Sequence, residues 1–164
     1  MRTAVALICE NGHLCSGNNE GSTERFCSKC GEPLISNCPN CRSIIPGDTY
    51  FDDEPESGVI AFPIFMTQKD IPSYCTSCGD AFPWTSAAIE AAQELIDLED
   101  KFSPEEKDLL KQDIIDLTKD SPKQKVACVR VKKLAQKAGK VFMDTMHDVV
   151  VGVVSEAVRK SLWG

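Results

Sequence analysis

Eight residues of the chain form four short pairs of metal-binding side chains. The pairs are Cys9 with His13, Cys27 with Cys30, Cys38 with Cys41, and Cys75 with Cys78. One tight turn can present two ligands at such a spacing, and two turns complete the four-coordinate shell of a zinc ion. The spacing therefore predicts two structural zinc ions per chain.

The sequence around the pairs indicates how they combine. A glycine follows Cys30 and another follows Cys78, and glycine admits the left-handed turn that closes such a knuckle. Each closing knuckle then takes the pair before it. We therefore expect site one to hold Cys9, His13, Cys27 and Cys30, and site two to hold Cys38, Cys41, Cys75 and Cys78. A cross-brace, in which the first and third pairs share a metal, is the open alternative.

Other interpretations of the cysteines stand beside this one. Four cysteines also bind iron or an iron–sulfur cluster, although the histidine of site one disfavours iron there. Redox-active C-x-x-C pairs are typical of a helix start in a βαβ unit, which this pattern lacks. Cys15 is an alternative ligand to His13, but its spacing from Cys9 is longer than usual. Cys128 falls in a predicted helix and is expected to be a small buried apolar residue.

The cysteines and the first residues also bear on the compartment. An odd number of cysteines without an export signal favours a reducing compartment, where thiolates stay free to bind metal. The apolar run at residues 4–8 is shorter than the core of a signal peptide and leads directly into Cys9. We therefore expect a cytoplasmic protein.

Composition divides the chain into a metal-binding region, residues 1–83, and a helical region, residues 84–164. In the first region the large apolar residues are scattered among Gly, Pro, Asn and Ser. So small a core needs an additional source of stability, and structural zinc supplies about 10–16 kcal/mol of apparent binding free energy near neutral pH. The expected fold class is a small zinc-stabilised β region of two tandem zinc ribbons, followed by an all-α region of three to four helices.

An acidic cluster lies in the long insert between Cys41 and Cys75. Its members are Asp52, Asp53, Glu54 and Glu56, and the apolar run 59–66 follows. We interpret the cluster as a solvated loop that leads into a strand, because it has neither the spacing of a calcium loop nor a companion base. A catalytic or calcium-binding cluster is the less favoured alternative.

Strong helix formers dominate the second region. A first helix is expected over about 86–99. The sequence Ser103-Pro104-Glu105-Glu106 has the capping-box pattern and opens a second helix, and Ser121-Pro122 repeats the start signal for a third.

The last part of the sequence predicts one amphipathic helix from about 140 to 163. Phe142, Met146, Val150 and Val153 lie on its apolar face and are the candidate interaction residues. The face is expected to pack on the first two helices, to pair with a second copy or to contact a bilayer. Charged residues interrupt the segment, which excludes a conventional membrane span.

Charge is distributed unevenly along the chain. Residues 1–83 carry five basic and eleven acidic side chains, residues 84–120 carry four and eleven, and residues 121–164 carry nine and three. The acidic first region is a poor candidate for binding phosphate backbones. We interpret the basic third helix first as a packing partner of the acidic segment before it. A membrane-surface or protein-binding role comes second, and nucleic acid is the least favoured partner.

Several motifs together resemble a known family. They are Cys9-Glu10-Asn11-Gly12-His13, Phe26-Cys27-Ser28-Lys29-Cys30-Gly31, Asn37-Cys38-Pro39-Asn40-Cys41, Ser73-Tyr74-Cys75 with Cys78-Gly79, and Phe82-Pro83-Trp84-Thr85. Over nearly the whole chain they resemble an uncharacterised bacterial zinc-ribbon family, a domain of unknown function. The resemblance implies a double zinc ribbon with a helical tail in a bacterial cytoplasm, and it brings no known activity.

These observations favour a non-enzymatic zinc-binding interaction or adaptor protein. Both predicted sites have four protein ligands, whereas a catalytic zinc keeps a position for water or substrate. A protein partner or self-association is therefore expected, and no small-molecule substrate. The alternative is a membrane-active effector, in bacterial conflict or phage defence, that acts through its basic and amphipathic C-terminal helices. A nucleic-acid adaptor that uses residues 123–140 is less favoured.

Overall fold

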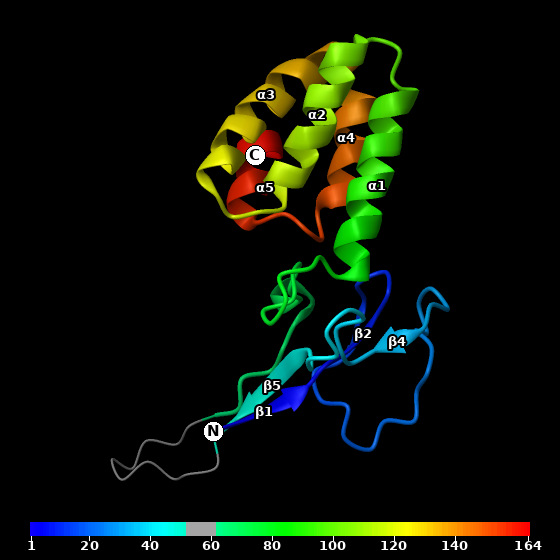
Figure 1. The fold of residues 1–164 in the computed structure, drawn as a ribbon, viewed down its shortest axis with the longest axis vertical. Coiled ribbons are helices and arrows are strands. Elements are labelled where there is room, and N and C mark those ends of the chain that lie inside the picture. Colours follow the sequence, from blue (N-terminus) through cyan, green and yellow to red (C-terminus); the bar gives the residue numbers. More distant parts are fainter. Residues whose placement is uncertain (52–61) are drawn as a thin grey trace. The chain divides into compact units, whose positions relative to one another are not determined.

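The computed structural model describes residues 1–51 and 62–164 (Figure 1). The chain divides into two compact units, Met1–Trp84 and Thr85–Gly164. The predicted acidic loop and the start of the apolar run at 59–66 lie outside the described residues. In the described part of that run, Ile64 forms an antiparallel bridge with Thr49.

The first unit is built from two small antiparallel sheets. β1 (Arg2–Val5) pairs with β5 (Pro46–Tyr50), while β2 (Leu7–Cys9) lies between β3 (Leu14–Ser16) and β4 (Leu34–Ile35). A short 3-10 helix, η1 (Gln68–Asp70), follows later in the unit. The expectation of a small β region is therefore confirmed.

Few apolar side chains form the core of this unit. Ile8 of β2 is fully buried, as are Ala6 and Ile45 next to the strands. Phe82 stacks on Trp84 with ring centroids 4.7 Å apart, and the Trp84 indole donates a hydrogen bond of 2.9 Å to the carbonyl of Pro72. Four of the predicted ligands, Cys9, Cys27, Cys38 and Cys75, are buried as well. The ligand side chains are thus a substantial part of what this unit buries.

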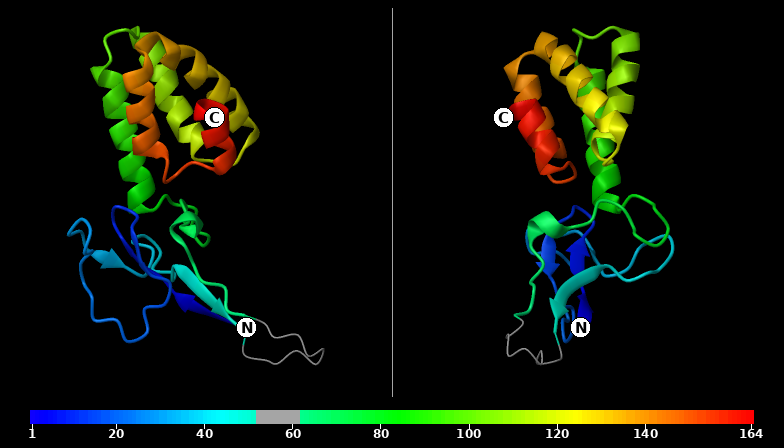
Figure 2. Two further views of the ribbon diagram at one scale, coloured as in Figure 1. Left: turned by 180° about the vertical axis from the view of Figure 1, so that it is seen from behind. Right: turned by 90° about the vertical axis from the view of Figure 1, so that its left-hand side faces the viewer.

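The second unit consists of five helices, in place of the three to four expected. They are α1 (Pro83–Leu98), which begins at the end of the first unit, α2 (Pro104–Leu117), α3 (Pro122–Ala138), α4 (Lys140–Val150) and α5 (Glu156–Trp163). Figure 2 shows α2 and α3 running side by side, and they share the most extensive helix–helix contact. The predicted capping box is present, since the Ser103 hydroxyl accepts from the amide of Glu106 and the Glu106 carboxylate accepts from the amide of Ser103.

The single terminal helix predicted from 140 to 163 is wrong, because the chain turns between α4 and α5. Helix α4 ends at Val150, and Ser155 caps the start of α5 by accepting a hydrogen bond of 3.4 Å from the amide of Val158. A serine at this position satisfies an otherwise orphaned helix amide, and Gly152 in the turn has a low helix propensity. Both residues favour a break over a continuous helix.

The apolar face predicted for this segment lies in the core of the second unit. Phe142, Met146, Val150 and Val153 are each at most 7% exposed. The Phe142 ring meets the Phe102 ring edge-on at 5.4 Å. The face was expected to pack on the first two helices, to pair with a second copy or to contact a bilayer. It packs within the unit, but the main helix contacts of α4 and α5 are with α3 and not with the first two helices. In the described part of the chain, no helix is both long enough and apolar enough to cross a membrane.

Acidic α2 and basic α3 pack through ion pairs as well as apolar contacts. The Arg130 guanidinium binds both carboxylate oxygens of Asp113, with 2.9 Å between Nε and Oδ2, and Asp113 is fully buried. Lys137 pairs with Glu106. The predicted packing of the basic segment on the acidic one is therefore confirmed.

Candidate metal centres

Site one is assembled from the turn after β2 and the knuckle before β4. The Cys9 Sγ lies 3.4 Å from the His13 Nδ1 and 3.7 Å from the Cys30 Sγ. The Cys27 Sγ lies 3.7 Å from the same nitrogen of His13. The four ligand atoms all lie within 4.8 Å of one another, so the structure brings together the four residues assigned to this site.

Site two joins two knuckles that are far apart in the sequence. The Cys38 Sγ lies 3.8 Å from the Cys78 Sγ, and the Cys41 Sγ lies 3.6 Å from the Cys75 Sγ. These four atoms also lie within 4.8 Å of one another. The structure therefore groups the pairs in chain order and not as a cross-brace.

The separations between ligand atoms match the edges of a metal-centred tetrahedron. Zn–S bonds of about 2.3 Å place two sulfur atoms about 3.8 Å apart, and place a sulfur about 3.6 Å from a nitrogen ligand. The S–S separations given above run from 3.6 to 3.8 Å, and the S–N separations are 3.4 and 3.7 Å. All nine cysteines are free, so no disulfide competes for the ligands. Each group therefore has the donors and the dimensions to hold one metal ion.

The three C-x-x-C knuckles share one backbone geometry. In each, the residue after the second cysteine donates its amide to the carbonyl of the first, at 2.8 Å for Gly31, 3.0 Å for Arg42 and 2.9 Å for Gly79. These residues have left-handed φ angles of 77°, 65° and 80°. The two glycines adopt this conformation without strain, whereas Arg42 does so at a cost.

Backbone amides of the knuckles point at ligand sulfurs and favour thiolates. The amide of Lys29 lies 3.4 Å from the Cys27 Sγ and lowers the pKa of Cys27 to about 6. In site two the hydroxyl of Ser43, 3.3 Å from the Cys75 Sγ, joins the backbone amides in lowering the pKa of Cys75 to about 6. The Ser43 hydroxyl also lowers the pKa of Cys41. Site one thus contains one thiol with a lowered pKa, and site two contains two.

Other thiols of the same sites keep their protons more firmly. Burial raises the pKa of Cys9 to about 11. At Cys78 the amide of Asp80 lowers the pKa, but burial and the neighbouring thiols outweigh it and raise the value to about 11. A second and third thiolate beside the first is costly without a cation, and a bound metal ion supplies the compensating charge.

Two residues outside the pairs support the turn from Cys9 to His13. The Gln68 amide donates a hydrogen bond of 2.5 Å to the carbonyl of Gly12 and accepts one of 2.9 Å from the amide of Leu14. Trp84 packs directly against Gly12, where an added Cβ would lie 2.9 Å from the Trp84 Cβ. Gln68 was not predicted, because a glutamine far along the chain carries no signal for a contact with this turn. Trp84 was identified from the sequence only as part of the Phe82-Pro83-Trp84-Thr85 motif, and its contact with Gly12 was not predicted.

A family model described as an uncharacterised protein conserved in bacteria, DUF2321, matches residues 2–162. The chain belongs to this family. The predicted resemblance to a bacterial domain of unknown function is thereby confirmed. No curated protein and no solved structure matches the chain. The match spans both candidate metal centres and nearly all of the helical unit.

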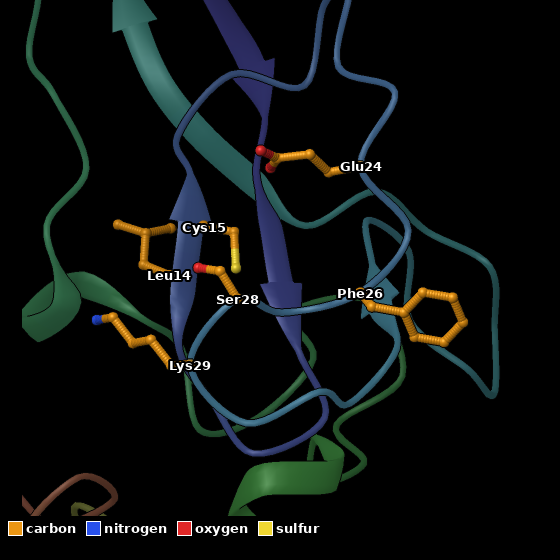
Figure 3. Close-up of a pocket in the computed structure, with 6 residues that line it drawn as sticks. All are labelled: Leu14, Cys15, Glu24, Phe26, Ser28 and Lys29. Atoms are coloured by element: carbon orange, nitrogen blue, oxygen red, sulfur yellow. The ribbon is translucent and has the colours of Figure 1, made fainter.

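In this DUF2321 chain, Cys15 stands beside site one without joining its ligands. Its Sγ points to the carbonyl oxygen of His13 at 3.7 Å, and burial raises its pKa to about 11. Cys15 lines a surface hollow of about 470 Å³ together with Leu14, Glu24, Phe26, Ser28 and Lys29 (Figure 3). The histidine, and not Cys15, supplies the fourth donor of site one in this geometry.

The remaining cysteine, Cys128, is buried in α3.

Proposed function

We propose that this DUF2321 chain is a non-enzymatic interaction protein of the bacterial cytoplasm, held together by two structural zinc ions. The observation that carries the proposal is that each centre offers four protein donors at tetrahedral separations. A catalytic zinc keeps a coordination position for water or substrate. Four protein donors fill the shell, so each ion serves as a staple for a unit with a small core.

The local structure around the ligands supports two tandem zinc ribbons. An antiparallel bridge flanks each C-x-x-C knuckle, namely Phe26 with Pro33, Asn37 with Ile44, and Tyr74 with Ala81. Such pairing of the chain on either side of a knuckle is the geometry that presents two sulfurs to one metal. The imidazole in site one favours zinc over an iron–sulfur cluster there.

The effector alternative receives no support from the terminal helices as they are folded. The apolar face of the terminal segment is buried in the second unit and would reach a bilayer only if the unit opened. This face consists of Phe142, Met146, Val150 and Val153. An interaction through the folded protein must use surfaces that are already exposed. This consideration favours the exposed side of α3 over the terminal segment.

Elemental analysis of the purified protein tests the metal assignment. We expect two zinc ions per chain, falling to one in Cys9→Ser and to one in Cys38→Ser. The two variants are matched, since each removes one buried sulfur from one centre. Iron as the main metal, or a single ion in the unaltered protein, would refute the assignment. Loss of both ions from either variant would show that the centres are coupled.

The choice of the nitrogen ligand has its own test. His13→Ala is expected to lose the ion of site one, whereas Cys15→Ala retains it, because the Cys15 Sγ points to a backbone carbonyl. The opposite pattern would show that the thiol of Cys15 is the ligand and that the imidazole is not.

A further inference from the structure

Helix α3 presents an exposed face of lysines around two valines. This α3 face consists of Lys123, Lys125, Val126, Val129, Lys132 and Lys133, all of which are exposed. Val126 and Val129 are 53% and 55% exposed, so much of their apolar surface is in water. The opposite side of the helix, with Ala127, Val131 and Ala135, is buried in the unit. The face is therefore a fixed feature of the folded unit.

Among the described residues of the second unit, the lysines of the α3 face form no ion pairs. Helix α3 contains no acidic residue. Its ion pairs with α2 use Arg130 and Lys137, which are not part of the face. Lys132 donates to the neutral carbonyl of Ser161 at 3.0 Å. Within residues 1–51 and 62–164, no ion pair joins a lysine of the face to a carboxylate, so its charge is available to an anionic partner.

The composition of the face disfavours a protein or a single-stranded nucleic acid as that partner. Protein interfaces are enriched in aromatic residues and arginine and depleted in lysine, whereas the face has lysines and two small valines. Single-stranded nucleic acids require aromatic stacking platforms. In the part of the second unit that is described, the exposed large apolar residues are all aliphatic: Leu98, Leu109, Val126, Val129 and Val141.

An anionic lipid surface suits each of these properties. Lysine ammonium groups on long flexible stems approach headgroup phosphates without losing much hydration, and the attraction adds up over several lysines. Aliphatic side chains between them fit the boundary between headgroups and acyl chains. We propose that the α3 face docks the folded helical unit on a bilayer that contains anionic phospholipid. This inference rests on the proposed interaction role, because it names the partner for that role.

Vesicle binding by the full chain tests the proposal. Co-sedimentation would compare vesicles of phosphatidylcholine alone with vesicles that contain phosphatidylglycerol, at low and high salt. The variant Lys125→Gln with Lys133→Gln removes two charges from the α3 face. The variant Lys69→Gln with Lys140→Gln removes two exposed charges that lie outside the α3 face and serves as the matched control. All four side chains are exposed, so zinc content and helical circular dichroism are expected to be unchanged in both variants.

The expected result is binding to the anionic vesicles only, weakened by salt. The α3-face variant should bind about 25-fold more weakly, at about fivefold per lysine, while the control variant binds like the unaltered protein. Equal loss in both variants, equal binding to neutral vesicles or no binding at all would overturn the proposal. Tighter binding to a DNA or RNA oligonucleotide than to vesicles would also overturn it. None of these outcomes alters the zinc content, so the zinc proposal is judged separately.

Discussion

Replacing Val150 with aspartate should unfold the helical unit without removing the metal ions. Val150 lies on α4 and is 1% exposed. The substitution places a carboxylate in the same core that holds Met146 and Phe142. The first unit has its own sheets and its own candidate staples, so the damage should be confined to the second unit.

The size of the effect follows from the burial. Burying a valine side chain contributes about 1.5–3 kcal/mol. Removing an unpaired carboxylate from water adds an effective penalty of several kcal/mol. The combined loss exceeds about 5 kcal/mol, which reaches the lower end of the stability of a whole domain. We therefore expect the cooperative thermal transition of the helices to be lost.

Val141→Asp is the matched control, because it introduces the same charge into the same helix. Val141 is 82% exposed, and an exposed substitution of this kind costs at most about 0.5 kcal/mol. Thermal melting by circular dichroism, together with zinc analysis, compares the two variants. Equal melting temperatures would refute the packing of α4 described here. Loss of zinc from Val150→Asp would refute the independence of the two units.

Two further predictions concern the metal centres. Arg42→Gly should raise the stability of the first unit by about 1 kcal/mol, because glycine relieves the left-handed strain at φ 65°. Chelator titration should then show that the variant retains its metal more tightly. Weaker retention would mean that the arginine side chain itself supports site two. The zinc affinity of each site should fall at least about tenfold per pH unit as the pH is lowered from 8 to 6. Binding displaces a proton from Cys9 in site one and from Cys78 in site two, and the pKa values of both thiols are raised to about 11. Competition titrations with a zinc indicator measure the affinity, and an affinity that is constant over this range would contradict the raised pKa values.

The candidate metal centres were the part of the structure most accessible from sequence. A C-x-x-C knuckle is a local unit, because its two sulfurs are set by one turn and the turn leaves a glycine signature at Gly31 and Gly79. Combining the knuckles in chain order then brought all eight predicted ligands into two groups. The supports of the turn at Gly12 were less accessible. Gln68 reaches it from far along the chain, and no local pattern marks such a contact.

The helical unit shows where periodicity stops being informative. The pattern of Phe142, Met146, Val150 and Val153 correctly marked an apolar face, and all four side chains are buried. Apolar residues continue at helical spacing past Val150, so the pattern did not indicate the turn. Two consecutive helices that pack on the same core can show the same spacing of apolar residues as one continuous helix. Two residues mark the break between α4 and α5. Ser155 caps the start of α5 with one hydrogen bond, and Gly152 has a low helix propensity.

The unequal charges of α2 and α3 connect the fold to the proposed docking surface. Asp113 and Glu106 neutralise Arg130 and Lys137, so the pairing of the two helices consumes only the cations that face α2. The remaining lysines of α3 contribute nothing to that packing and lose hydration least by staying in water. Exposed helix positions ordinarily carry charged residues, but on α3 these charges are all positive and they surround two exposed valines, Val126 and Val129. The surplus on the α3 face is therefore the feature of this unit that packing leaves unexplained, and an anionic surface outside the chain would account for it.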